Sequence, residues 1–154
     1  MRKLPLILAS LLIANFVSIS VAQQKAVPPY KLTAMKIVPF EGTSGKFEDE
    51  IRTAGEEREY LNELSKSLFV TIEVSGKKDT ENYPGRQLEV TVMEGKKLKT
   101  KRTELIGILN DEGKFYVPVF LYSAMCDEVT IKARIIGQKT PATISRKLSF
   151  QCGE

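Results

Sequence analysis

Apolar and polar residues alternate along most of the chain after residue 66. A period of two residues is typical of strands that bury one face and expose the other. A strand is also expected at 30–38, and the polar run 97–110 is predicted to be a strand that becomes apolar at Leu105. The apolar residues in phase, run by run, are Leu68, Val70, Ile72 and Val74; Leu88, Val90 and Val92; Phe115, Val117, Val119 and Leu121; Val129, Ile131, Ala133 and Ile135; and Ile144, Leu148 and Phe150. In the last run Arg146 falls out of the pattern.

The segments between these runs have turn composition. Asn110-Asp111-Glu112-Gly113 suits a type I turn closed by a left-handed glycine. Pro118 lies inside a strand pattern but has no N–H to donate to a ladder. Its strand is therefore predicted to lie at a sheet edge or to carry a bulge.

About seven short alternating strands predict an all-β fold, an antiparallel two-sheet sandwich over residues 30–154. An immunoglobulin-like or transthyretin-like arrangement is favoured, and a small antiparallel barrel is the alternative. The chain has no tryptophan, so the tryptophan-on-disulfide core of antibody domains is absent. The pattern predicts an architecture and points to no family.

Residues 41–66 interrupt the strand pattern with three glycines and many charged residues. Their apolar residues recur at helical spacings: Ile51, Ala54, Leu61, Leu64 and Leu68. We expect either a short helix near 56–64 or a long loop. Binding and catalysis concentrate on inserted segments of this kind more than on strands.

The first 22 residues have the layout of a cleavable secretory signal. Its parts are the basic Arg2 and Lys3, the apolar stretch from Leu4 to Val17, and the small Ser20 and Ala22 before a cut at Gln23. An uncleaved anchor is the alternative, but the apolar stretch is short for a span of about 20 residues. We therefore expect a secreted or periplasmic protein with a signal peptide at 1–22 and a flexible lead-in at 23–29. No membrane span is expected after cleavage.

Cys126 and Cys152 are the only cysteines, and the chain has no histidine. A zinc site needs three or four such ligands, and the spacing is not that of a Cys-x-x-Cys redox pair. In an exported chain two cysteines most simply form a disulfide. We predict this bond.

The predicted disulfide would close a hairpin whose turn lies near residue 139. The register that keeps apolar residues on one face pairs positions whose numbers sum to 279. It offsets the two cysteines by one residue. The pairs are Val129–Phe150, Ile131–Leu148 and Ile135–Ile144.

Several chemistries are disfavoured by composition. Without histidine there is no Ser-His-Asp triad and no imidazole metal ligand. The formal charge falls from +4 to +2 when Arg2 and Lys3 leave with the signal, so nucleic acid is not an expected partner. We predict no cofactor, no metal site and no enzymatic activity.

The favoured function is an exported, non-catalytic module that binds a protein or glycan of the cell envelope or extracellular space. The candidate binding residues lie in the loop near residue 80 and in the 41–66 segment. They are Lys77, Lys78, Tyr83, Arg86, Glu56, Glu57 and Tyr60. One alternative is an inhibitor of a secreted hydrolase. Another is a hydrolase that uses the carboxylates of Glu48, Glu50 or Glu57.

Overall fold

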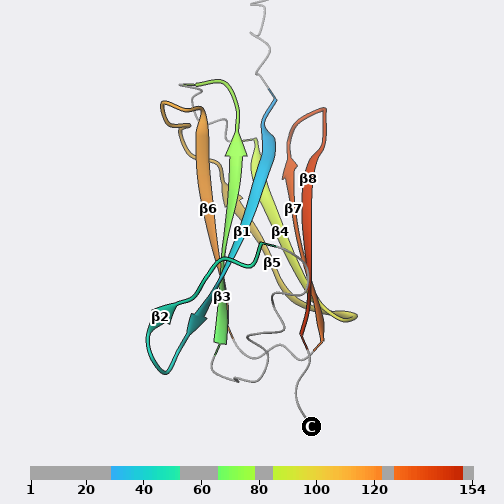
Figure 1. Cartoon of the computed structure of the whole chain (residues 1–154). Coiled ribbons are helices and arrows are strands. Elements are labelled where there is room, and N and C mark those ends of the chain that lie inside the picture. The colour runs from blue at the N-terminus through green and yellow to red at the C-terminus, as the bar shows by residue number, and fades with distance from the viewer. Residues whose placement is uncertain (1–28, 53–65, 79–84, 123–126, 151–154) are drawn as a thin grey trace, which may run out of the picture.

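The computed structural model describes residues 29–52, 66–78, 85–122 and 127–150 as an all-β fold (Figure 1). Its strands are β1 (Lys31–Glu41), β2 (Lys46–Phe47), β3 (Lys66–Ser75), β4 (Gln87–Glu94), β5 (Lys97–Leu105), β6 (Lys114–Leu121), β7 (Glu128–Ile136) and β8 (Ala142–Ser149). The first sheet has the order β2-β1-β3-β6, and the second sheet has the order β5-β4-β7-β8. All pairings are antiparallel. The predicted two-sheet sandwich is confirmed, with the two-residue β2 added to seven long strands.

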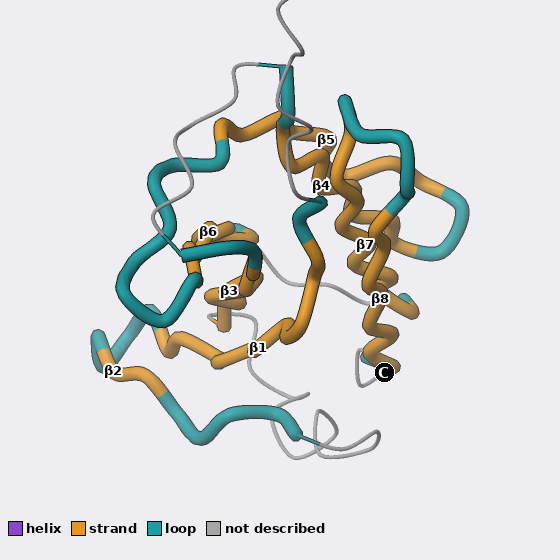
Figure 2. Tube along the Cα trace, turned by 90° about the horizontal axis from the view of Figure 1, so that it is seen from above, coloured by secondary structure: helices purple, strands orange, loops and turns teal. Residues whose placement is uncertain are grey.

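The two sheets lie face to face, as the view along the strands shows (Figure 2). The residues in the predicted apolar phase fill the space between them. Val70, Ile72 and Val74 of β3 are fully buried, as are Val90 of β4 and Ile131 of β7. Each such side chain contributes on the order of 2 kcal/mol from burial.

The connectivity is immunoglobulin-like. In constant-type immunoglobulin domains the first, second and fifth strands share a sheet with the fourth. Here β1, β3 and β6 are the first, second and fifth long strands, and they also share a sheet. The fourth, β5, instead pairs with β4 in the second sheet. The fourth long strand of this protein therefore belongs to the opposite sheet from its counterpart in a constant-type immunoglobulin domain.

Two local predictions for β6 and its turn are confirmed. β6 is an edge strand, and Pro118 pairs with Thr71 of β3. Gly113 has φ +73°, and its N–H donates to the Asn110 carbonyl at 2.8 Å. The Asn110 side chain accepts from the N–H groups of Glu112 and Lys114 at 3.0 and 2.9 Å.

The prediction that the strand beginning at residue 97 extends to residue 110 is wrong. β5 ends at Leu105, which is 58% exposed, and the chain then crosses from the second sheet to the first. The buried apolar residues of this stretch are Ile106 and Leu109 in the crossing. The apolar stretch thus marks a buried connection, not a continued strand.

The predicted register of the last hairpin is also wrong. β7 and β8 pair with numbers that sum to 277, so Ala133 lies opposite Ile144 and Ile135 opposite Ala142. The two pairs nearest the turn therefore join an isoleucine to an alanine, whereas Val129 lies opposite Leu148 and Ile131 opposite Arg146. The prediction had matched large residues with each other, which the space between the sheets does not require.

The 41–66 segment begins as part of the sandwich. Ile51 is buried, and its N–H donates to the Ile37 carbonyl of β1 at 2.9 Å. Arg146 Nη2 of β8 donates to the Ile51 carbonyl at 3.1 Å. Ile51 and Leu68 are the two ends of the predicted helical pattern. Ile51 lies in a segment that is hydrogen-bonded to β1, and Leu68 lies in β3. Residues 53–65, with the expected helix near 56–64, lie outside the described residues, as do the predicted signal peptide and both cysteines.

Candidate binding site

The described ends of the two segments predicted to bind a partner lie at opposite ends of β1 and β3. The two strands are antiparallel, with Lys31 opposite Ser75 and Glu41 opposite Lys66. Ser75, from which the chain enters the loop near residue 80, is therefore separated from Glu41 and Lys66 by the length of β1, roughly 33 Å at 3.3 Å per residue.

The predicted binding cations that the structure describes mostly make contacts within the fold. The Arg86 guanidinium lies 5.2 Å from the centre of the buried Tyr30 ring, a cation–π contact. Lys78 Nζ lies 3.6 Å from an Asp111 carboxylate oxygen, and Lys77 is exposed beside it. The remaining candidates, Tyr83, Glu56, Glu57 and Tyr60, lie outside the described residues.

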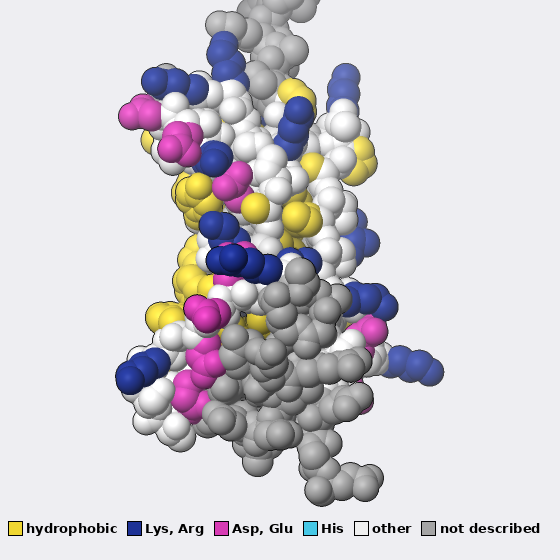
Figure 3. Space-filling view, viewed as in Figure 1, with side chains coloured by type: hydrophobic (Ala, Val, Ile, Leu, Met, Phe, Trp, Pro, Cys, Tyr) yellow, Lys and Arg dark blue, Asp and Glu magenta, His cyan; other side chains and the backbone are white. Residues whose placement is uncertain are grey.

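Five aromatic rings from four segments meet on the outer side of the first sheet. We call this cluster the aromatic face; its members are Phe40 of β1, Phe47 of β2, Phe69 of β3, Phe120 of β6 and Tyr122 just after β6. Neighbouring ring centres are 5.1 to 6.1 Å apart, so the five rings form one continuous chain of contacts. The space-filling view shows apolar side chains running down the side of the molecule where β6 lies (Figure 3).

Strand register brings these rings together. Phe40 lies directly opposite Phe47, and Phe69 lies directly opposite Phe120. Phe40, Phe69 and Phe120 alternate with buried residues and therefore point away from the core, and Phe47 is exposed. A signal for this face was present in the sequence, since Phe69, Phe120 and Tyr122 fall out of phase with the apolar runs that contain them.

The aromatic face remains open to solvent. Phe47 is 59% exposed, Tyr122 81% and Phe120 36%. These three rings alone present about 350 Å² of surface, taking about 200 Å² for a whole aromatic side chain. A contiguous apolar patch of a few hundred Å² on a monomer is often a functional surface.

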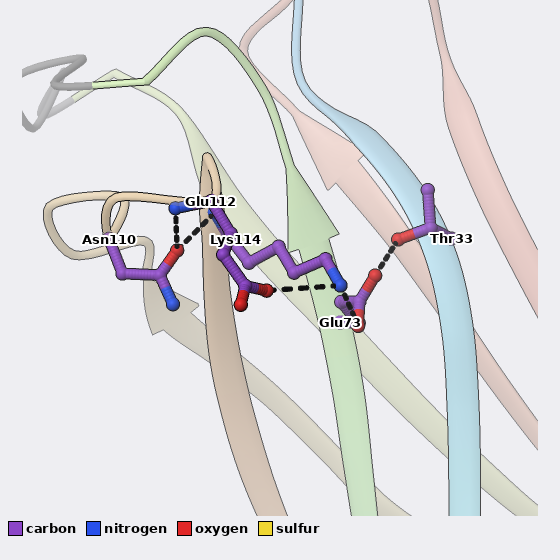
Figure 4. Close-up of polar contacts among 5 residues, drawn as sticks. All are labelled: Thr33, Glu73, Asn110, Glu112 and Lys114. Atoms are coloured by element: carbon purple, nitrogen blue, oxygen red, sulfur yellow. Dashed lines mark hydrogen bonds and ion pairs between the residues drawn. The ribbon is translucent and has the colours of Figure 1, made fainter.

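Near the aromatic face, on the same outer side of the sheet, polar side chains of β1, β3 and β6 contact one another around Glu73 (Figure 4). We call this group of residues the Glu73 clamp. Thr33 Oγ1 of β1 donates to Glu73 Oε1 of β3 at 2.6 Å, and Lys114 Nζ of β6 lies 3.6 Å from Glu73 Oε2. The hydrogen bond from Thr33 and the charge of Lys114 lower the pKa of Glu73 from its usual value near 4.5. Glu73 in turn raises the pKa of Lys114. Charged and hydrogen-bonded side chains therefore lie toward one end of this outer face, and the aromatic face lies toward the other.

The comparisons with known proteins do not identify a relative. No protein-family model and no curated protein matches this chain. Among the described residues no group of three or more histidine, cysteine or acidic side chains is placed to hold a metal ion. Nor do the described ranges contain a helix with the length and apolar character needed to cross a membrane.

Proposed function

We propose that the protein is an exported, non-catalytic module that binds an apolar surface of a partner protein through the aromatic face. The observation that carries the proposal is the chain of five rings, three of them substantially exposed, on the outer side of the first sheet. Aromatic residues are enriched at protein interfaces because they supply a large contact area at a low entropy cost. The layout of residues 1–22 supports export.

The ring orientations favour a protein over a glycan. A sugar chain stacks on several ring faces that are turned the same way. Here each neighbouring pair is inclined by 58 to 68°. Such edge-to-face rings present an uneven apolar surface that aliphatic and aromatic side chains can fill. The face covers about half of the roughly 800 Å² that each partner buries in a standard interface. It would form the apolar centre, surrounded by polar contacts such as the Glu73 clamp.

The inhibitor and hydrolase alternatives are not favoured by a specific observation. Glu48 and Glu50 lie on the extended segment beside β1, where the Glu48 N–H donates to the Pro39 carbonyl at 3.0 Å. Glu57 lies outside the described residues. The aromatic face involves none of these carboxylates.

The test is a comparison of immobilised proteins against the secreted and envelope proteins of the native host. The variant Phe47→Ser with Phe120→Ser removes the two rings that join the other members. The matched control is Leu98→Ser with Ile108→Ser, which removes two apolar side chains that are 52% and 70% exposed outside the aromatic face. Circular dichroism establishes that both variants are folded.

We expect the wild-type and control proteins to retain the same partner and the Phe47/Phe120 variant to lose it by at least about tenfold. Two interface anchors of about 1 kcal/mol each would together weaken binding roughly thirtyfold, which is above this limit. If the variant retained the same proteins as the wild type, the aromatic face would not be the binding site.

A further inference from the structure

The outer side of the second sheet has a different chemistry from the aromatic face. Its strands carry hydroxyl and basic side chains in rows that run across the sheet. One row places Lys101, Thr91, Lys132 and Ser145 side by side on β5, β4, β7 and β8. The next row places Thr103, Glu89, Arg134 and Thr143 in the same order. We call these two rows the basic face; each spans about 14 Å at 4.8 Å between strands.

A pocket of about 210 Å³ opens in the basic face between its two rows. Its lining consists of Glu89 and Thr91 of β4 and Lys132 and Arg134 of β7. This volume is below the roughly 300–1,000 Å³ of typical small-molecule sites. The pocket therefore suits one charged unit of a longer chain that lies across the sheet.

Glu89 holds two of the cations in fixed positions. Its Oε1 accepts from Arg134 Nε at 2.6 Å, and its Oε2 lies 3.2 Å from Lys101 Nζ. These two contacts lower the pKa of Glu89, so its carboxylate is ionised at neutral pH. Arg134 is bound through Nε alone in this contact, which leaves the outer nitrogens of its planar fork available to a second anion.

Lys132 supplies the uncompensated charge of the pocket. Its side chain is exposed and makes no ion pair or hydrogen bond with any other described residue. The three cations Lys101, Lys132 and Arg134 face the single carboxylate of Glu89 here. The site therefore carries a net charge of +2, with the Thr91 hydroxyl beside it.

We propose that the basic face binds an acidic polysaccharide, with Lys132 and Arg134 contacting a carboxylate or sulfate group seated in the pocket. The threonine and serine hydroxyls along the two rows then hydrogen-bond to sugar hydroxyls. Two adjacent cations, one of them able to bind two oxygens at once, suit a carboxylate or sulfate. This site lies on the opposite sheet from the aromatic face and does not depend on the function proposed for that face.

The composition of the basic face favours a polysaccharide over other polyanions. β4, β5, β7 and β8 contain no aromatic residue, whereas single-stranded nucleic acids are bound by stacking their bases on aromatic rings. Peripheral membrane binding combines basic residues with apolar side chains that enter the lipid. The two rows that define this face have hydroxyl groups instead.

The test measures binding of the full protein to immobilised polygalacturonate and dextran sulfate, with neutral dextran as the reference. The variants are Lys132→Gln alone and Lys132→Gln with Arg134→Gln. Since the Lys132 side chain is exposed and makes no ion pair or hydrogen bond with another described residue, we expect its replacement to leave the fold intact. The matched control is Lys36→Gln with Lys46→Gln, which removes two exposed lysines from the first sheet and the same total charge.

We expect the wild type to bind at least one acidic polysaccharide and not neutral dextran, and to release it as salt is raised. The single variant should weaken binding about threefold and the double variant about tenfold or more, while the control stays within twofold. Equal losses in the double variant and the control would overturn the proposal, because net charge alone would then explain binding. It would also be overturned if the wild type bound neither acidic polysaccharide, or bound anionic phospholipid vesicles or single-stranded DNA instead.

Discussion

At the residue scale, the turn between β7 and β8 depends on Gly137. This residue has φ +80°, and a Cβ atom there would collide with the Gly85 carbonyl oxygen. We expect Gly137→Ala to lower the free energy of unfolding by about 3 kcal/mol or more, from backbone strain and the displaced carbonyl together. Gly45→Ala is the control, since φ is +68° there but the space around it is open. It should cost only about 1 kcal/mol in urea denaturation.

The Thr33–Glu73 hydrogen bond makes a pH-dependent contribution to stability. Because the pKa of Glu73 is lower in the folded protein, this contribution is complete above the usual value near 4.5. It is lost as the pH falls through the folded value. Thr33→Val removes the hydrogen bond that lowers the pKa of Glu73 most, so this pKa should rise in an NMR titration. The stability difference between wild type and variant should shrink as the pH falls through the lowered pKa of Glu73, below the usual value near 4.5. Thr143→Val, on the other sheet, should leave the pKa of Glu73 unchanged.

At the element scale, the segment 48–51 joins the two sheets where β1 faces β8. Ile51 is buried between them, and its backbone bonds to Ile37 on one side and to Arg146 on the other. We expect Ile51→Ala to cost about 2–4 kcal/mol in chemical denaturation, from lost burial and the cavity that remains. Ile108→Ala, at a position that is 70% exposed, should cost less than about 0.5 kcal/mol. Equal losses of unfolding free energy in the two variants would show that the 48–51 segment does not contribute to the core.

The contacts of Ile51 also show which parts of the fold the sequence could and could not predict. Alternation assigned the buried face of the long strands correctly, since it depends only on neighbouring residues. The register of β7 and β8 depends on what lies across the sandwich. Arg146 is a misfit within its own strand, but it donates to the Ile51 carbonyl, 95 positions earlier in the chain. No pattern within one strand predicts such a contact, so the predicted register was wrong by two residues.

At the scale of the whole molecule, the two proposed binding faces lie on different sheets and differ in chemistry. Strands β1, β2, β3 and β6 bring Phe40, Phe47, Phe69 and Phe120 together, and the four other strands assemble the basic face. The sequence predicted neither face as a site, because each requires knowing which strands are neighbours. Out-of-phase aromatic residues in β3 and β6 were the available signal. The two proposals together assign a protein partner to one sheet and a polyanion to the other.

The stability of the whole sandwich is predicted to depend on a Cys126–Cys152 disulfide. The last described pair of the final hairpin is Glu128–Ser149, two residues after Cys126 and three residues before Cys152. The bond would close a loop of about 27 residues, which in the chain-entropy model stabilises the fold by roughly 3.5 kcal/mol. That is a large share of the 5–15 kcal/mol, approximately, that holds a domain of this size folded.

Replacing both cysteines with serine removes the bond without leaving a free thiol. We expect Cys126→Ser with Cys152→Ser to lower the free energy of unfolding by about 3 kcal/mol in urea, with the β-sheet circular dichroism unchanged. Mass spectrometry after alkylation checks the bond directly, since both thiols of the exported protein should react only after reduction. Alkylation of both cysteines without a reductant, or a double variant as stable as the wild type, would contradict the disulfide. The first result would also weaken the case for export, because an oxidising compartment is what makes this pairing expected.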